Sequence, residues 1–364
     1  MKNVFLKTFG CQMNFSDTER ITNQLIQSDY QLKSDFESAD LVIINTCGVR
    51  ETAENRAMSL AHKIRRQKPK VKIIITGCLA NRPDIQKKIG AKADLFLGIQ
   101  QLFFYLKPAK QCPESQTGQS NNSDSYLAIQ PKYQHNRQIL VPIMTGCNNF
   151  CSYCVVPYAR GREFSRSKAQ ISAEIAQAVK QQDLQSVVLL GQNVNSYRDP
   201  NNETGFGFPE LLAKLARTYP KIKFSFLTSH PKDFSQNLIR VIKSNPNVSR
   251  SIHLPVQAGS DKILKAMNRP YTKKQYLSLV AEIKKQLPDV ILSTDVIVGF
   301  PGETRADFSQ TIDIFKRAGF HSAYINKYSP RPGTAAYKLQ DPISQKEKRR
   351  REQVLKQTLE RIKA

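Results

Sequence analysis

Short apolar segments alternate with amphipathic segments along nearly the whole chain, and this alternation restricts the fold more than any other feature of the sequence. In the first third, segments rich in valine, isoleucine, leucine and phenylalanine have the composition of strands that are buried on both faces. A helix is expected to begin at Ser16, because Glu19 three residues later completes a capping-box pattern. The pattern predicts a small parallel sheet with helices on its faces. The expected strands cover residues 4–8, 41–45, 71–76 and 95–97, and the next two helices cover 52–67 and 83–89.

The same alternation returns from residue 139 onwards with longer units. Six strand–helix units fit an open, partial (β/α) barrel better than a complete barrel of eight. The final segment, 344–363, is predicted to be a basic helix that covers a barrel edge and keeps its arginine run in solvent. The expected strands are 139–144, 186–190, 223–228, 251–255, 291–298 and 322–328, and the expected helices are 168–181, 209–218, 234–243, 261–267, 273–286 and 305–317.

A change in composition divides the chain into two α/β domains. The stretch 111–124 is rich in glutamine, serine and asparagine and has too little apolar content to form a core. We therefore expect an N-terminal domain over residues 1–108, a linker over 109–134 and a barrel domain over 135–364.

Charge and cysteine usage limit the partners and the cellular compartment. Lysine and arginine outnumber aspartate and glutamate by 55 to 30, and the net charge of +25 favours a polyanionic partner, first of all nucleic acid. No apolar run approaches the ~18 residues of a membrane span, and the N-terminus lacks a signal-peptide pattern, so we expect no membrane partner and a cytoplasmic location. In that setting, seven cysteines favour metal ligation or catalysis over disulfides.

The strongest motif is the CxxxCxxC sequence formed by Cys147, Cys151 and Cys154. It directly follows an expected strand, and barrel active sites lie at the carboxyl ends of the strands. Three thiolates at this spacing can bind three irons of a [4Fe–4S] cluster and leave the fourth iron open. This arrangement is typical of radical-SAM enzymes, in which S-adenosylmethionine (SAM) binds the open iron and yields a radical that abstracts hydrogen. Zinc is the weaker alternative, because it usually takes four ligands and no fourth cysteine or histidine follows nearby.

Three further cysteines occupy equivalent places in the N-terminal domain. Cys11, Cys47 and Cys78 each lie just beyond an expected strand and beside a glycine. Neighbouring parallel strands lie ~4.8 Å apart, so the three thiols should meet at one edge of the sheet, where open α/β sheets bind ligands. A single free cysteine is usually just buried, but three at equivalent positions favour a second cluster. Cys112 in the linker is expected to be incidental.

The chain resembles the radical-SAM methylthiotransferases along nearly its whole length, and within them the branch that acts on dimethylallyladenosine in tRNA. The segments that carry the resemblance are TFGCQMN at 8–14, NTC at 45–47, GC at 77–78, the cluster loop with VVPYARGRE at 146–163, LGQNVNSY at 190–197, TSHP at 228–231, HLPVQAGS at 253–260, DVIVGFPGE at 295–303 and YSPRPGT at 328–334.

The resemblance implies an enzyme that methylthiolates carbon 2 of N6-dimethylallyladenosine next to the tRNA anticodon. It implies two [4Fe–4S] clusters, with Cys147, Cys151 and Cys154 holding the radical cluster and Cys11, Cys47 and Cys78 the auxiliary one. SAM would act in two roles, as methyl donor and as radical source. The implied partners are the tRNA anticodon loop and a reduced flavodoxin or ferredoxin, and we expect a monomer. In this family a small RNA-binding β-barrel follows the last helix, and we expect that barrel to be absent from this chain.

Several strand-end residues are candidates for SAM binding, because glycines let the backbone approach a ligand and amides and hydroxyls can bond its polar edges. Ordinary turn chemistry is the alternative role for each of them. Arg160, Arg162, Arg166 and Arg331 are candidates for the RNA backbone. The SAM candidates are Gly191, Gln192, Asn193, Thr228, Ser229, Gln257, Ser260, Val298 and Gly299.

Two other functions compete with this one. The first is methylthiolation of threonylcarbamoyladenosine in tRNA or of an aspartate in a ribosomal protein, and the VVPYARGRE string argues against both. The second is a non-catalytic iron–sulfur RNA-binding protein, which would bind RNA without cleaving SAM.

Overall fold

The computed structural model describes residues 2–49, 51–107, 124–134, 137–201 and 205–363. The chain divides into two compact units, the first made of residues 1–147 and 155–184 and the second of 148–154 and 185–364. The domain limits expected from the sequence stay a prediction, and residues 109–123 of the expected linker, with Cys112, lie outside the described residues. Within the described part, no helix is both long and apolar enough to cross a bilayer.

The first unit contains a five-stranded parallel sheet in the order β2-β1-β3-β4-β5. Two of its inner strands, β3 and β4, are almost entirely buried, as expected for strands covered on both faces. All four predicted strands of this region are confirmed. The short edge strand β2 was not predicted, because its sequence YQLK has no apolar run. The strands are β1 (Lys2–Phe9), β2 (Tyr30–Lys33), β3 (Leu41–Thr46), β4 (Lys72–Gly77) and β5 (Leu95–Phe96).

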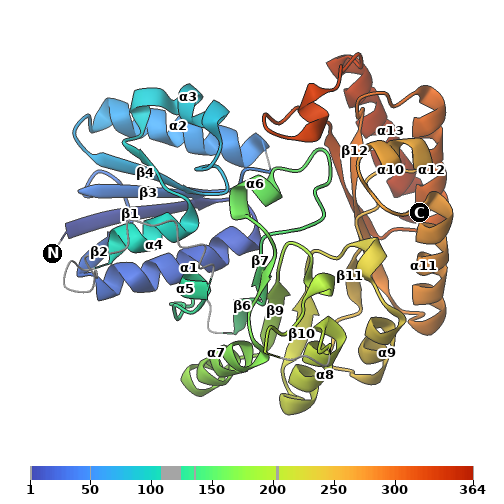
Figure 1. Cartoon of the computed structure of the whole chain (residues 1–364), viewed down its shortest axis with the longest axis horizontal. Helices are drawn as coiled ribbons and strands as arrows, with labels where there is room; N and C mark the ends of the chain where they lie inside the picture. The colour runs from blue at the N-terminus through green and yellow to red at the C-terminus, as the bar shows by residue number, and fades with distance from the viewer. Residues whose placement is uncertain (1, 50, 108–123, 135–136, 202–204, 364) are drawn as a thin grey trace. The chain divides into compact units, whose positions relative to one another are not determined.

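Helices cover both faces of this sheet (Figure 1). Alternate residues of a strand point to opposite faces, so Val42 and Ile44 pack against α2 and α3, whereas Leu41 and Ile43 pack against α1 and α4. Tyr126 and Leu127 of a short helix are buried in the second of these cores. The helices are α1 (Gln12–Gln27), α2 (Glu51–Gln67), α3 (Pro83–Ile89), α4 (Ile99–Leu106) and α5 (Asp124–Leu127), with a 3₁₀ turn over Gly90–Lys92.

The predicted start of the first helix is wrong. Helix α1 begins at Gln12, and Ser16 is a buried residue within it whose hydroxyl donates to the carbonyl of Leu140 (3.2 Å). The actual N-cap is Cys11, whose backbone amide donates to the side-chain oxygen of Asn14 (3.3 Å). The helix therefore starts immediately at the thiol.

The rest of the first unit leads from this sheet to a long helix. Buried Glu174 on α7 forms ion pairs of 2.7 Å with both Arg20 on α1 and Arg166. These pairs attach α7 to the same helix that begins at Cys11. The elements are β6 (Gln138–Pro142), β7 (Met144–Thr145), α6 (Val156–Arg160), β8 (Phe164–Ser165) and α7 (Lys168–Gln181), and β7 pairs with β8 antiparallel.

The second unit repeats strand and helix in the predicted order. Strand β10 pairs parallel with β9, and β12 pairs parallel with both β11 and β13. The strands are β9 (Ser186–Leu190), β10 (Lys223–Phe226), β11 (Ser251–His253), β12 (Ile291–Val298) and β13 (Ser322–Lys327). The helices are α8 (Phe208–Thr218), α9 (Gln236–Ser244), α10 (Asp261–Ala266), α11 (Lys273–Gln286), α12 (Arg305–Ala318) and α13 (Gln345–Lys363), with 3₁₀ turns over Val194–Ser196, Pro231–Asp233 and Ala335–Lys338. The predicted α/β class is confirmed.

Glu19 is a buried carboxyl of α1 that holds the chain segment before β6. Its carbonyl accepts from the amide of Lys132 (2.9 Å), and its side chain accepts from the amide of Gln134 (3.4 Å). Burial raises the pKa of Glu19 to about 7. In the unfolded chain this carboxyl ionises near pH 4.5, so stability is lost as the pH rises from that value through the pKa of the folded state.

Replacing Glu19 with glutamine should therefore raise the stability at high pH. The amide keeps an acceptor for Gln134 and never has to ionise, so E19Q should exceed the wild type by about 3 kcal/mol in free energy of unfolding at pH 8. The two proteins should be nearly equal at pH 4. Urea denaturation across this pH range measures the difference, and E37Q, at an exposed glutamate, is the control. If the free energy of unfolding of E19Q had the same pH dependence as that of the wild type, ionisation of Glu19 would not destabilise the folded protein.

Candidate active site

Cys11, Cys47 and Cys78 lie directly beyond the carboxyl ends of β1, β3 and β4, which are neighbours in the sheet. A Cβ placed on Gly10 would lie 2.6 Å from the Cβ of Cys47, and one placed on Gly48 would lie 3.3 Å from the Cβ of Cys78. The three cysteine segments are thus in direct contact. The strand order reverses between β1 and β3, and ligands of open α/β sheets bind in the crevice at such a switch point.

The three thiols influence one another electrostatically. A hydrogen bond with Cys47 and the charge of Arg160 lower the pKa of Cys11 to about 6. The same hydrogen bond and burial raise the pKa of Cys47, and burial raises that of Cys78. The thiolate is the form that binds metal, and Cys11 at the start of a helix is the thiol that reaches it most easily.

Two buried asparagines hold the edge on which the thiols lie. Asn45 on β3 donates its amide to the carbonyl of Asn14 (2.8 Å) and to the hydroxyl of Thr18 (3.0 Å). A Cβ on Gly77 would lie 2.5 Å from the side-chain oxygen of Asn45, and the φ of Gly77 is +80°, so only glycine fits there. These contacts fix β3, β4 and α1 relative to one another beside the cysteines.

Arg160 reaches into this site from α6. Its Nε donates to the Sγ of Cys78 (3.1 Å) and its Nη2 pairs with Asp17 (2.6 Å). The side chains of Arg160 and Asp17 are 3% and 0% exposed. The expectation that Arg160 meets RNA is therefore wrong, and so is that for Arg166, which is buried against Glu174. In both cases the positive charge is used inside the protein.

Among the described residues, no group of three histidine, cysteine or acidic side chains is placed so that it could hold a single metal ion. In a [4Fe–4S] cluster each thiolate binds its own iron, so the sulfurs stand around a body larger than one ion. The thiols of the first unit have the donor chemistry for such a cluster, together with a buried cation that can offset its negative charge.

The CxxxCxxC loop is divided between the two units, and each part is held by its own neighbours. In the first unit the amide of Cys147 donates to the carbonyl of Gly161 (3.2 Å). A Cβ on Gly146 would lie 2.0 Å from the carbonyl oxygen of Arg162. The backbone of Gly161 and Arg162 thus packs against the backbone at the first cysteine.

In the second unit the loop between the other two cysteines is fixed by backbone contacts. The amide of Ser152 donates to the carbonyl of Met267 (3.0 Å), and its hydroxyl donates to the carbonyl of Ala266 (2.8 Å). The carbonyl of Ser152 accepts from the amide of Ala336 (2.7 Å), and the amide of Cys154 donates to the carbonyl of Cys151 (2.9 Å). Arg269 directs Nη1 at the Sγ of Cys151 (3.6 Å). Cys151 and Cys154 therefore sit on a rigid loop beside a buried cation, as thiolate ligands require.

The SAM candidates lie at the carboxyl ends of β9, β10 and β12 and beyond β11. Thr228 and Gln257 have φ values of +71° and +67°, a left-handed conformation that is strained for these residue types. Such strain persists where the surroundings require it, and it concentrates at functional sites. Two candidates already use polar groups inside the protein, because Ser260 donates to Asp307 (2.6 Å) and the amide of Gly299 donates to Glu303 (2.6 Å).

Buried polar atoms without a partner among the described residues gather at these strand ends. Each lies beyond β9 or β10, where a ligand with hydrogen-bonding edges would satisfy it. Burial and the charge of Arg269 lower the pKa of His230 to about 2, so its ring is neutral. Its Nδ1 accepts from the amide of Lys232 (3.3 Å), which leaves the proton on Nε2. The atoms are Oε1 of Gln192, Oδ1 of Asn193, Nδ2 of Asn195, Oγ of Ser229 and Nε2 of His230.

Comparisons with known proteins agree along the chain. The profile of the family described as "Uncharacterized protein family UPF0004" matches residues 3–98, and that of the radical SAM superfamily matches 141–315. The tRNA-2-methylthio-N(6)-dimethylallyladenosine synthase of Acetivibrio thermocellus is 40% identical over 98% of this chain and 76% of its own length. The synthase of Thermotoga petrophila is 40% identical over 98% of this chain and 82% of its own length. The chain belongs to this synthase family.

Solved structures share the fold of this synthase family member at low sequence identity. The radical S-adenosylmethionine methyltransferase TsrM from Kitasatospora setae matches with a TM-score of 0.62 and 13% identity, over 92% of this chain and 77% of that one. The cobalamin-dependent S-adenosylmethionine radical enzyme OxsB matches with a TM-score of 0.60 and 12% identity, over 99% of this chain and 56% of that one. At these identities the likeness concerns the fold alone.

Several residues beside the synthase motifs were not predicted as site residues. Asp17 and Arg269 have no periodic or spacing signal of their own, and only their contacts mark them. Asn195 and His230 lie inside segments that carry the resemblance, so motif membership could have indicated them. Arg269 could not be found in this way, because a single arginine after α10 looks like an ordinary surface charge.

Removing the charge of Arg160 should destabilise the first unit strongly. R160Q would leave buried Asp17 without its cation, and breaking such a pair costs about 3–5 kcal/mol of unfolding free energy. Urea denaturation of R160Q, of the double variant D17N/R160Q and of R56Q, at an exposed arginine of α2, gives the comparison. The double variant should recover most of the loss and R56Q should lose almost nothing. A small effect in R160Q would mean that Asp17 is not charged in the folded protein.

Proposed function

We propose that this chain methylthiolates carbon 2 of N6-dimethylallyladenosine next to the tRNA anticodon, using SAM and iron–sulfur clusters. The relatives are tRNA-2-methylthio-N(6)-dimethylallyladenosine synthases, and the matched superfamily is the radical SAM superfamily. The observation that carries the proposal is the meeting of Cys11, Cys47 and Cys78 at the switch point of the first sheet. This second set of thiols could hold the additional cluster that sulfur insertion would use beside the radical cluster.

The two sets of thiols would each hold a different cluster. When bound, the clusters and SAM supply the one-electron chemistry, the sulfur and the methyl group. Cys147, Cys151 and Cys154 would hold the radical cluster, and Arg269 would donate to the Cys151 sulfur and offset its charge. Cys11, Cys47 and Cys78 would hold the auxiliary cluster, with Arg160 in the same role at Cys78. Hydrogen bonds to ligand sulfurs and local charge set the reduction potential of such clusters.

SAM itself would be held at the strand ends of the second unit. Gln192, Asn193, Ser229 and the neutral ring of His230 offer buried polar atoms that a bound ligand would satisfy. The left-handed turns at Thr228 and Gln257 shape the backbone around them. The remaining parts of the proposal are the tRNA anticodon loop as substrate, a reduced flavodoxin or ferredoxin as electron donor, a monomeric state and a cytoplasmic location. The net charge of +25 supports the polyanionic substrate.

The test is an anaerobic reaction of the iron–sulfur-reconstituted chain with SAM, sulfide, dithionite and tRNA that carries N6-dimethylallyladenosine. Nucleoside mass spectrometry should detect the 2-methylthio derivative. A parallel reaction with tRNA that carries threonylcarbamoyladenosine, and another with ribosomal proteins, should yield no methylthiolated product. Product in either of these, and none with dimethylallyladenosine, would assign the chain to the competing branch. RNA binding without release of deoxyadenosine would favour the non-catalytic iron–sulfur protein.

Alanine replacements should separate the two thiol sets. Loss of Cys147, Cys151 or Cys154 should abolish deoxyadenosine release, since the radical cluster loses a ligand. Loss of Cys11, Cys47 or Cys78 should spare deoxyadenosine release and abolish methylthiolation, and should lower bound iron by about half if each cluster holds four irons. Iron analysis and product analysis of each variant give the answer, with C112A as the matched cysteine control. Full methylthiolation by the second group of variants would refute the auxiliary cluster.

A further inference from the structure

The C-terminal helix α13 directs two of its many cations into the protein. Lys348 is fully buried and Arg351 is 4% exposed, whereas Arg349 and Arg350 are exposed. Lys348, Arg351 and Leu355 follow helical spacing, so they share the face that packs on the rest of the unit. The expectation that the whole arginine run is solvated is therefore wrong for this face.

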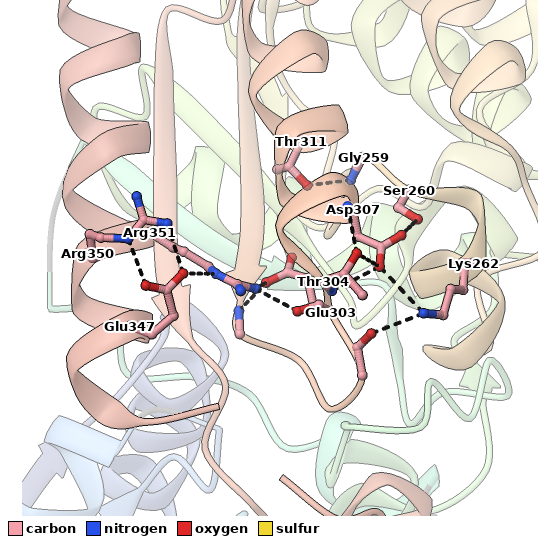
Figure 2. A network of polar contacts seen from close by, with 12 residues as sticks. Gly259, Ser260, Lys262, Glu303, Thr304, Asp307, Thr311, Glu347, Arg350 and Arg351 are labelled. Atoms are coloured by element: carbon pink, nitrogen blue, oxygen red, sulfur yellow. Dashed lines mark hydrogen bonds and ion pairs between the residues drawn. The ribbon is translucent and has the colours of Figure 1, made fainter. Parts of the chain in front are cut away.

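Arg351 binds the turn that follows β12. Its Nη1 donates to the carboxylate of Glu303 (2.6 Å) and to the carbonyl of the same residue (2.9 Å), as Figure 2 shows. The same carboxylate oxygen accepts the backbone amide of Gly299 (2.6 Å). A continuous chain of bonds thus joins α13 to the backbone at the carboxyl end of β12.

Lys348 packs the aliphatic part of its side chain against the same glycine. A Cβ on Gly299 would lie 2.4 Å from the Cγ of Lys348, and the φ of Gly299 is +70°. The ammonium group of Lys348 pairs with Asp341 and donates to the carbonyl of Tyr328 (3.3 Å). The amide of Tyr328 in turn donates to the carbonyl of Val298 (2.9 Å). The peptide group that joins Val298 to Gly299 at the end of β12 is therefore held at both its carbonyl and its amide.

The turn beyond β11 is anchored on a second helix in the same network. The amide of Gly259 donates to the hydroxyl of Thr311 (2.9 Å), and the hydroxyl of Ser260 donates to Asp307 (2.6 Å), both on α12 (Figure 2). The guanidinium of Arg351 lies 5.4 Å from the ring centroid of Phe308 on that helix. The two strand-end turns that carry Ser260 and Gly299 thus share one support.

The arrangement depends on the charge of Arg351. Burial raises the pKa of Glu303, and the hydrogen bond and charge of Arg351 oppose this effect. Without the guanidinium, an ionised Glu303 would be a buried charge without its counterion, which is strongly unfavourable. The carboxylate would turn away, and the Gly299 amide would lose its acceptor, or it would take up a proton and leave that amide the weaker acceptor of a neutral group.

We propose that Arg351 is a positioning residue for SAM, which acts through Glu303 to fix the backbone of Val298 and Gly299 where they meet the bound cofactor. The inference rests on the proposed function, since it takes the carboxyl ends of β9 to β12 as the SAM site. Arg351 touches neither the thiols nor the polar atoms at β9 and β10, so its effect should be on SAM affinity and not on cluster content.

The test compares R351M with R350M. Both arginines bind Glu347, with contacts of 2.9 Å and 2.7 Å, but only Arg351 is buried and reaches Glu303. Calorimetric titration of the reconstituted chains with SAM should show an affinity reduced at least about tenfold in R351M and unchanged in R350M. Hydrogen exchange of the peptide that contains Gly299 should be faster in R351M only. Iron content should equal that of the wild type in both, and KM for SAM should rise more than kcat falls.

A neutral replacement at Glu303 keeps the inference testable if R351M folds poorly. In the double variant E303Q/R351M the amide oxygen can still accept from Gly299 and no buried charge is left alone, so SAM affinity and slow exchange should largely return. Faster exchange in R351M together with wild-type SAM affinity would overturn the inference and leave the proposed function intact. A wild-type chain that does not bind SAM would overturn the proposed function, and the inference with it.

Discussion

The parallel pairing of strands is the constraint on which the thiols of the first unit and the candidate cofactor residues depend. Every strand of the first sheet runs in the same direction, so whatever follows β1, β3 and β4 emerges at one edge. Cys11, Cys47 and Cys78 are far apart in sequence, yet the register of three adjacent strands places them together. The same rule brings together the residues beyond β9 and β10 in one sheet, and those beyond β11 and β12 in another. The candidate chemistry is thus collected by strand topology, and helices add buried cations such as Arg160.

Buried ion pairs hold the turns at these edges, where hydrogen bonds of the sheet no longer can. Arg351 with Glu303 and Arg166 with Glu174 each join a helix to a segment beyond a strand. Arg160 with Asp17 and Arg20 with Glu174 join α1, which starts at a strand end, to α6 and α7. Such pairs contribute little net stability compared with apolar residues of the same size, but the loss of one partner is expensive. They therefore fix one arrangement of the backbone against its alternatives. In a site that needs thiols and turns in defined places, this geometric role is the useful one.

The sequence predicted the strands and helices of the second unit closely, because each long apolar or amphipathic run is compatible with only one type of secondary structure. It failed where the signal is local and weak. Strand β2 is a short edge strand with no buried residue. Helix α1 starts at Cys11 through its N-cap contact with Asn14, which the sequence does not mark as clearly as the capping-box pattern at Ser16.

Charge was the least reliable guide from sequence. Arg160, Arg166, Lys348 and Arg351 look like surface cations by composition, and only their carboxylate partners in the fold show that they are internal. The partners of Arg160 and Arg351 are distant in sequence. The cysteine positions, in contrast, followed from spacing and strand ends alone. Residues whose role depends on the backbone around them could be predicted, whereas residues whose role depends on a distant partner could not.

The placement of Cys11 has a consequence for the order of assembly. This residue is both a thiol of the candidate site and the residue from which α1 starts, and the free backbone amides of a helix start favour negative charge. Whatever stabilises the thiolate must stabilise the first turn of α1, by thermodynamic reciprocity. Helix α1 also carries Asp17, Glu19 and Arg20, which bind α6, the segment before β6 and α7. Filling of the thiol site and consolidation of the first unit are therefore coupled events, in which maturation of the protein and completion of its fold reinforce each other.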